Sequence, residues 1–355
     1  MIDLIHLDIV NDTGPLSYAH RLSSEVSDMI ARTRQSLGKA PTPMAGLALG
    51  IASLGWCWEN AGHFDGRLQL LGAAIAAVLL VILTFKFLLH PRLLWQDLAH
   101  PVVGSVVPTY AMGTMVVSKA VGMLDAGLGE GLWLFAVLLH LAFLATFVWH
   151  RAKQFEIHHM VPSWFVPPVG IIVADVAFPG GQFAALANGL LWFGMLCYGL
   201  MLPLMLYRLI FSHEVPDAAK PTIAILAAPA SLSLAGYLTV SEEPSLLLVA
   251  VLLGIAVLMT GIIYLAFIKL LRLPFSPGYA AFTFPLVIGA TALFKVSHLV
   301  EQWPQAAEYV EQIRLLAHFE LGAATLIVGY VALRYLMFFL PLDGSDEVAH
   351  GMVRR

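Results

Sequence analysis

The sequence predicts an all-α integral membrane protein whose ten transmembrane helices form five helical hairpins, and three observations support this fold class. Of the 355 residues, 59% are hydrophobic and only 12% are charged, which is low for a soluble protein. Ten apolar stretches approach the length of about 20 residues that crosses a bilayer core. Prolines concentrate in alternate stretches. The predicted spans are 42–58, 68–89, 101–119, 131–149, 163–178, 184–210, 221–240, 245–268, 278–297 and 315–340.

A polar segment precedes the first span, and its apolar residues recur at the spacing of a helix face. These residues are Leu22, Val26, Met29, Ile30 and Leu37. An amphipathic helix here would lie on the membrane surface or pack under the bundle, and a weakly ordered tail is the alternative. The expected organisation is a cytoplasmic N-terminal segment (1–40), a ten-helix membrane domain (41–340) and a cytoplasmic tail (341–355).

Proline distinguishes the odd-numbered spans from the even-numbered ones. The odd spans contain or begin with Pro41, Pro43, Pro101, Pro108, Pro162, Pro167, Pro168, Pro221, Pro229, Pro277 and Pro285. Among the even spans, only the sixth has an internal proline, Pro203. Proline frees a backbone carbonyl that lipid cannot satisfy. The odd spans are therefore expected to line an inner pathway, with the even spans as a straight outer wall.

The basic residues predict the topology. With both termini on one side, that side carries 15 Lys and Arg residues and the other side carries 4. Positive charge marks the cytoplasmic side, so both termini are expected there, in the plasma membrane or a bacterial inner membrane. The longest connections are expected on the outer side at 59–67, 120–130 and 298–314, and none is long enough for a soluble domain.

Three segments carry a family resemblance. They are Met44–Gly55, Pro162–Asp175 and Gly278–Leu286, and the most specific pieces are Trp164–Gly170 and the Thr-Phe-Pro at 283–285. Together they resemble the tellurite-resistance/dicarboxylate transporter family, which includes the plant guard-cell slow anion channels and the yeast malate permease. The resemblance covers roughly residues 41–340.

The resemblance implies a ten-helix bundle, a homotrimer, and a pore within each protomer that is lined by the five odd helices. It also implies that a phenylalanine of the ninth helix occludes this pore. Alignment of the Thr-Phe-Pro motif makes Phe284 the expected gate, because a benzyl group beside a proline kink can exclude water. Phe282 is the fallback; two residues away on a helix, it points to a different face. Ordinary packing is the alternative role for Phe284.

Small, kinked and hydroxyl-bearing positions on the odd spans complete the expected pore lining. They are Gly50, Ser53, Pro108, Thr109, Pro168, Gly170, Pro229, Ser231, Thr283 and Pro285. The glycines allow either a pathway or simple helix contact, and Gly46 with Gly50 forms a GxxxG pattern. The hydroxyls, including Thr291, either donate to a partly dehydrated anion or bond carbonyls of their own helix.

Ionisable residues in the spans are few. Lys119, Asp175 and Lys295 are expected near the outer ends of the third, fifth and ninth helices. The lysines could draw anions into the outer mouth, and Asp175 would oppose them unless it pairs with one; snorkelling is the alternative. His318 and Glu320 could belong to the same cluster.

Other function classes lack support in the sequence. His158 and His159 are adjacent in an inner loop, where adjacent side chains are expected to point apart, so no metal site is expected. The glycine-rich 127–131 segment is expected to be an outer loop without nucleotide-binding context. Two cysteines without CxxC spacing suggest no disulfide framework. No cofactor, nucleic-acid partner or enzymatic activity is expected.

The predicted function is transmembrane transport of small anions through a Phe-gated, channel-like pore. The expected partners are small inorganic or carboxylate anions and the lipid bilayer. No lysine or arginine falls at mid-pore, which favours weakly held, chloride- or nitrate-type anions. The alternative is a carrier or exporter of a C4-dicarboxylate such as malate, of sulfite, or of a tellurite-type oxyanion.

The topology is testable with single cysteines introduced at Arg32 and Asp125. A membrane-impermeant thiol reagent added to sealed right-side-out vesicles should label position 125, and position 32 only after the membrane is opened. Labelling of both positions from the same side would contradict the predicted topology.

Overall fold

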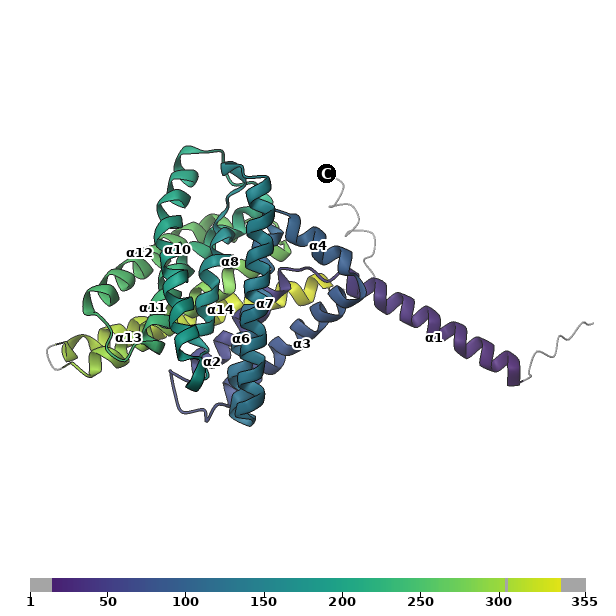
Figure 1. Ribbon diagram of the computed structural model, residues 1–355, viewed down its shortest axis with the longest axis horizontal. Coiled ribbons are helices and arrows are strands. Elements are labelled where there is room, and N and C mark those ends of the chain that lie inside the picture. Colours follow the sequence, from purple (N-terminus) through teal and green to yellow (C-terminus); the bar gives the residue numbers. More distant parts are fainter. Residues whose placement is uncertain (1–14, 304–305, 340–355) are drawn as a thin grey trace, which may run out of the picture.

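The computed structural model describes residues 15–303 and 306–339, and within these residues every regular element is a helix (Figure 1). The expected tail at 341–355 lies outside the described residues. Seven helices are long and apolar enough to cross a membrane, and a bent pair passes the same test together. Two shorter apolar helical stretches, Met44–Trp58 and Pro162–Val176, complete the set. The described part of the chain is therefore a helical membrane protein.

Each even-numbered predicted span is one continuous helix. The helices are α3 (Arg67–Leu89), α7 (Ala126–Lys153), α10 (Ala184–Phe211), α12 (Leu246–Leu270) and α14 (Val310–Phe339). Pro203 lies inside α10 without ending it. These helices are rich in Leu, Ile, Val and Ala, which keep a backbone ladder intact in lipid.

Most odd-numbered segments are broken at their prolines. The first is α2 (Met44–Trp58), and the third is α5 (Val103–Val106) with α6 (Thr109–Leu124). The fifth is η2 (Pro162–Phe165), α8 (Val166–Val169), η3 (Gly170–Ile172) and α9 (Val173–Val176). The seventh is η5 (Asp217–Ala227) with α11 (Ala228–Val240), and the ninth is η6 (Pro277–Phe282) with α13 (Thr283–Glu301). Short 3₁₀ turns occur where proline prevents the α-helical ladder.

Burial separates the two kinds of segment. In the seventh and ninth segments, 78% and 83% of the most apolar window is buried within the chain. In the five continuous helices the corresponding share is 28–39%, and their outward faces carry exposed Leu, Val, Ile and Phe. Backbone that lacks a complete ladder is thus kept inside, while continuous helices present apolar side chains outward.

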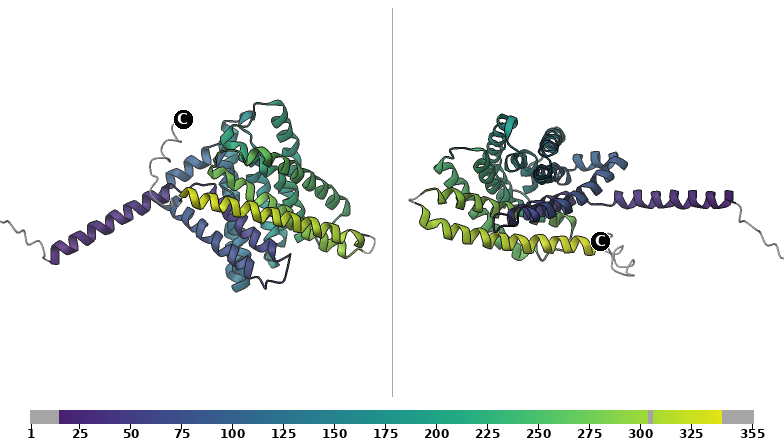
Figure 2. Two further views of the ribbon diagram at one scale, coloured as in Figure 1. Left: turned by 180° about the vertical axis from the view of Figure 1, so that it is seen from behind. Right: turned by 90° about the horizontal axis from the view of Figure 1, so that it is seen from below.

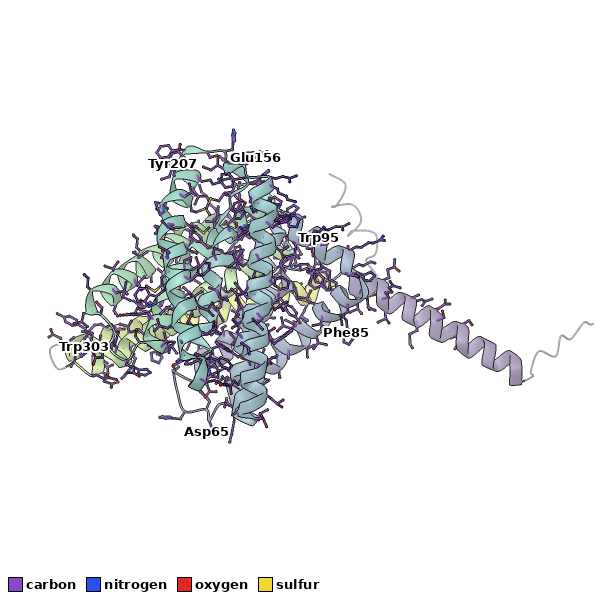
Figure 3. All side chains as sticks on the ribbon, in the orientation of Figure 1. Asp65, Phe85, Trp95, Glu156, Tyr207 and Trp303 are labelled. Carbon is purple, nitrogen blue, oxygen red and sulfur yellow. The ribbon has the colours of Figure 1, made fainter. Side chains whose placement is uncertain are left out.

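The bundle has two ends, which Figure 3 locates by labelled residues. Tyr207, Glu156 and Trp95 lie along the upper and right side of that view, and Asp65 and Trp303 lie along the lower and left side. We name these the inner end and the outer end, after the predicted topology. Figure 2 shows the yellow helix α14 lying along the outside of the bundle.

The helix α4 (Pro91–Ala99) was not expected from the sequence. It lies between the second and third spans and turns by 107° into the third segment. Asp97 of α4 forms an ion pair with Lys86 of α3 at 3.6 Å, and Lys86 also donates to the Thr42 hydroxyl at 2.8 Å. The segment is amphipathic and begins with proline at its first position, but its nine residues are too short and too polar to be found by a search for long apolar spans.

The prediction of an outer loop at 120–130 is wrong. The helix α6 continues to Leu124 and α7 begins at Ala126, so Asp125 is the whole connection. Its carboxylate accepts a hydrogen bond from the Leu128 backbone N–H at 2.8 Å and caps α7. The glycine-rich 127–131 segment is the first turn of that helix. An N-cap aspartate offsets the low helix propensity of these glycines.

The helix α1 (Pro15–Gly38) projects away from the bundle on the right of Figure 1. Its C-terminal part is held at the junction of α3 and α4. The Arg34 side chain donates to the Leu89 carbonyl at 3.3 Å, and the His90 imidazole bonds the Arg34 carbonyl at 3.0 Å. These two contacts fix the direction in which α1 leaves the membrane domain.

Carbonyls at the proline breaks accept hydrogen bonds from buried side chains. His140 of α7 is fully buried, and its Nε2–H donates to the Pro167 carbonyl at 2.8 Å. Trp133 of the same helix donates to the Ala174 carbonyl at 2.9 Å. Trp164 donates to the Pro101 carbonyl at 2.9 Å, and Tyr335 of α14 donates to the Pro277 carbonyl. Three of these four donors lie on continuous outer helices, and Trp164 lies on the broken fifth segment itself.

Hydroxyl groups inside the broken segments also donate hydrogen bonds to backbone carbonyls. Ser105, Thr109, Thr222 and Thr283 each donate to the carbonyl three residues earlier, at 2.6–2.7 Å. All four lie at or near a proline break or a 3₁₀ turn. A nearby hydroxyl stabilises a carbonyl that has lost its α-helical donor.

Replacing His140 tests this account of the fold. We expect His140→Leu to lower the stability of the purified protein by about 1–3 kcal/mol, because the Pro167 carbonyl is left buried without a donor. The measurement is the thermal unfolding midpoint in detergent.

Thr146→Val is the matched control on the same helix. The Thr146 hydroxyl is exposed and bonds the Ala142 carbonyl of its own helix, so this variant should unfold near the wild-type midpoint. A His140→Leu variant as stable as Thr146→Val would contradict the donor role of His140.

Candidate functional site

A cavity of about 340 Å³ lies among the five odd-numbered segments, toward the inner end. Each segment contributes side chains, and in the four broken segments these side chains lie near the break. The lining includes Pro43 and Leu49; Val106, Thr109 and Met112; Phe165, Val169 and Gly170; Thr222, Ile225 and Pro229; and Ala280, Phe284 and Pro285. We call this space the inner cavity. Segments separated by more than 200 residues therefore enclose one volume.

The inner cavity is apolar. Among the described residues that line it, none carries an ionisable side chain. The hydroxyls of Thr109 and Thr222 face it, but each already donates to a carbonyl of its own segment. An ion in this space would lose hydration without meeting a fixed charge, so tight binding is disfavoured.

A second, much smaller hollow of about 10 Å³ lies beyond the inner cavity, toward the outer end. It is lined by Ser53, Trp56, Val116, Val173, Val176, Phe284, Ile288 and Thr291. We call it the outer hollow. Phe284 lines both spaces, and no other residue of 15–303 and 306–339 does. Its ring therefore lies between them, and it is 7% exposed.

The position of Phe284 follows from its local structure. The 3₁₀ turn η6 ends at Phe282, and α13 begins at Thr283 with Pro285 in its first turn. The Thr283 hydroxyl donates to the Ala280 carbonyl at 2.7 Å and contacts the Gly46 carbonyl at 3.2 Å. These bonds fix the start of α13 against α2.

Gly50 makes this contact possible. A Cβ at Gly50 would lie 2.5 Å from the Thr283 Cβ and 3.3 Å from the Phe284 nitrogen. Any side chain there would push α2 and α13 apart. Gly50 therefore serves close helix packing beside Phe284, and it does not line either cavity.

The remaining sequence-predicted lining residues divide into two groups. Those that line a cavity are Thr109, Gly170, Pro229 and Pro285 in the inner cavity and Ser53 in the outer hollow. Those that line neither are Gly50, Pro108, Pro168, Ser231 and Thr283. Proline breaks a helix without itself facing the space that the break opens, and this explains Pro108 and Pro168.

Phe282, the fallback gate residue, lies in the core. It is fully buried, and its ring packs on Phe267 at 5.3 Å and on Tyr279 at 4.7 Å between ring centroids. It lines neither cavity. Of the two phenylalanines at the start of the ninth segment, only Phe284 faces the cavities.

The hydroxyls on the odd segments mostly bond their own backbone. Ser231 and Thr291 donate to carbonyls four residues earlier at 3.1 and 3.0 Å, and Thr109 and Thr283 donate three residues back. Ser53 has no hydrogen-bond partner in the described part of the chain, and it faces the outer hollow. Of these five hydroxyls, Ser53 alone keeps a free proton to donate.

Two lysines lie near the outer end without an acidic partner among the described residues. Lys119 donates to the Phe178 carbonyl at 2.9 Å and lines an outer pocket of about 540 Å³. Lys295 is half-buried and feels the repulsive field of Lys119. Glu130 also lines the outer pocket and accepts a hydrogen bond from Gln182 at 3.0 Å. Two close positive charges without a counter-ion attract anions.

Asp175 does not pair with either lysine. It is fully buried, and neither carboxylate oxygen has a hydrogen-bond partner among the described residues. It packs beside Gly236 of α11, where an added Cβ would lie 3.3 Å from the Asp175 Cβ. The carboxylate therefore lies between helices and leaves the two lysines uncompensated.

Glu320 does not join Lys119 and Lys295 in a charge cluster at the outer end, as the sequence had suggested it could. It is 2% exposed on α14 and accepts a hydrogen bond from Tyr264 of α12 at 2.6 Å. Its other oxygen points at Gly289 of α13, 3.0 Å from where a Cβ would stand. His318 instead bonds the Arg314 carbonyl at 2.7 Å. In the sequence, the sign of the buried Glu320–Tyr264 contact was a glutamate within an otherwise apolar helix.

Comparisons with known proteins agree with this architecture. The family described as voltage-dependent anion channel matches residues 43–336, which is most of the chain, and it is the tellurite-resistance/dicarboxylate transporter family that the motifs resemble. The chain belongs to this family. Its members are channels and transporters rather than enzymes, so anion transport is the general function of this membrane protein.

Two relatives are uncharacterized transporters of Methanocaldococcus jannaschii. One is 26% identical over 235 residues, which cover 59% of this chain and 68% of the relative. The other is 28% identical over 260 residues, which cover 62% of this chain and 72% of the relative. Both similarities support transport as the general function.

If the two outer lysines attract anions, the anion flux should depend on them at low salt and much less at high salt. Lys119→Gln with Lys295→Gln should lower anion flux into liposomes by about tenfold at low ionic strength, because the pair raises the local anion concentration. At high salt the Debye length shortens to a few ångströms, and the variant should approach wild-type flux.

Lys269→Gln, an exposed change near the inner end of α12, is the matched control and should leave the flux unchanged at both salt concentrations. Equal losses at low and high salt in the double variant would contradict electrostatic attraction by these lysines.

Proposed function

We propose that the chain conducts small monovalent anions, of the chloride or nitrate type, through a path along the axis of the five odd-numbered segments. The path runs from the inner cavity, past Phe284, into the outer hollow and on to the lysines of the outer end. Membership of an anion channel and transporter family supports this proposal. The observation that carries it is that Phe284 is the one residue shared by both cavities among the described residues.

The proposed membrane arrangement has ten crossings and both termini in the cytoplasm. Seven helices pass the length and hydropathy test alone, and the bent third segment passes with α4. The first and fifth segments would cross as shorter helices shielded by the wall of even helices. A plasma-membrane or bacterial inner-membrane location and a homotrimer belong to the same proposal.

The apolar path favours a channel over a tight-binding carrier. A dicarboxylate or other dianion would require fixed positive charge within the site. Among the described residues, the cavity linings hold no such charge, and the nearest candidates are the lysines of the outer end. A monovalent anion held by weak dipoles could enter and also leave quickly.

Replacing the Phe284 ring tests whether Phe284 is the gate of the proposed path. We expect Phe284→Ala to raise anion flux at least tenfold per folded protein, because it removes the apolar plug between the two cavities and lets water enter. The measurement is conductance or flux in reconstituted liposomes, normalised to protein that elutes as a single species in detergent.

Phe282→Ala is the matched control from the same turn. Its ring is core, so truncation should cost about 3–5 kcal/mol of stability without opening the path. A well-folded Phe284→Ala variant that conducts no more than wild type would overturn the gate assignment.

A further inference from the structure

The inner end carries a cluster of metal-binding side chains outside the proposed path. Glu156, His158 and His159 each offer one ligand atom, and these three atoms all lie within 4.8 Å of one another. The His158 Nε2 is 3.2 Å from a Glu156 carboxylate oxygen. All three residues belong to the connection between α7 and the fifth segment. Figure 3 places Glu156 at the tip of that connection.

The expectation that His158 and His159 point apart is wrong. The two rings lie 4.3 Å apart between centroids, at an interplanar angle of 56°. Both histidines lie in the one-turn 3₁₀ helix η1 (Ile157–His159), in which the His159 N–H donates to the Glu156 carbonyl at 3.0 Å. Adjacent positions on a 3₁₀ turn differ by about 120° in direction, so the rings converge through rotation of the two side chains about their own bonds and not through the backbone spacing.

A third histidine approaches from another connection. The His213 ring, between α10 and η5, lies 6.3 Å from the His158 ring. Arg208 of α10 is 1% exposed and holds both connections by their backbones. Its guanidinium donates to the His158 carbonyl and to the His213 carbonyl, each at 2.9 Å. The ligand side chains are therefore carried on backbone that is already fixed.

We propose that Glu156, His158 and His159, with His213 as the fourth ligand, bind a divalent transition metal of the Zn²⁺ class. Imidazole nitrogens with one carboxylate oxygen suit Zn²⁺, Co²⁺ or Ni²⁺, whereas Mg²⁺ and Ca²⁺ prefer oxygen ligands alone. Ligands of tetrahedral Zn²⁺ stand roughly 3.3–3.6 Å apart, close to the His158–Glu156 separation. Side-chain exposures of 47% for His158 and 58% for Glu156 leave the site open to solvent.

The position gives the bound metal a structural consequence. The His158 connection leads into η2, whose Phe165 lines the inner cavity, and the His213 connection leads into η5, whose Thr222 lines the same cavity. A metal held by both connections would tie the starts of the fifth and seventh segments together. Metal binding itself does not depend on the proposed anion path, and its test uses binding alone.

The test is a titration of the untagged full-length protein in detergent with Zn²⁺ against a competing chromophoric chelator. We expect one equivalent to bind the wild type, and Co²⁺ to give the visible absorption of a tetrahedral site. His158→Ala with His159→Ala should abolish this stoichiometric site, and His213→Ala should weaken it by about 10–100-fold.

His63→Ala is the matched control, because His63 is an exposed histidine at the opposite end, in the 59–66 connection. It should bind the metal as the wild type does. Each variant is compared at an unchanged elution volume, and Glu156→Gln serves as a milder ligand change that keeps the side-chain size. Unchanged Zn²⁺ stoichiometry and affinity in the double histidine variant would overturn the site, as would equal competition by Mg²⁺.

Discussion

The structure depends on one constraint: backbone carbonyls at the proline-containing breaks inside a membrane must find donors within the protein. Lipid offers none, and each unpaired carbonyl would cost on the order of several kcal/mol. His140 meets the Pro167 carbonyl, Trp164 meets the Pro101 carbonyl, and Tyr335 meets the Pro277 carbonyl. Two of these donors, His140 and Tyr335, come from continuous outer helices, so the wall also completes the hydrogen bonding of the inner segments.

The same constraint shapes the path. Breaks in the backbone of the third, fifth, seventh and ninth segments open space beside the continuous helix α2, and the inner cavity occupies that space. The hydroxyls nearest the breaks are used on backbone carbonyls, which leaves the cavity wall apolar. A pathway built from proline breaks thus has few polar groups left to bind an ion. It suits brief passage past an apolar constriction better than storage of a bound substrate.

Charge is placed at the ends of the bundle or between helices, and not in the inner cavity or the outer hollow. The lysines lie near the outer end, the histidine cluster and Arg208 lie at the inner end, and Asp175 and Glu320 are buried against glycines of neighbouring helices. Gly236 and Gly289 provide the room that these two carboxylates need. Charged groups at the two ends can act on approaching ions, while the middle of the path stays uncharged.

The sequence alone located the apolar helical segments of the described residues to within about five residues, because apolar length and proline position are local properties that need no contacts. A motif in the sequence led to Phe284 as the proposed gate. It missed α4 and the capped start of α7, since a nine-residue amphipathic helix is too short to stand out among long apolar spans, and glycines are typical of a loop rather than of a helix start. These errors concern connections, where pattern is least informative.

Which side chains meet was decided only by the tertiary structure. The sequence left Phe284 and Phe282 as alternatives, and the packing of Phe282 on Phe267 separates them. It could not say which hydroxyls keep a free proton, or that His158 and His159 converge beside His213. At a proline break the helical period is lost, so side-chain direction no longer follows from sequence spacing. Contacts between segments far apart in the chain then depend on how the broken helices pack.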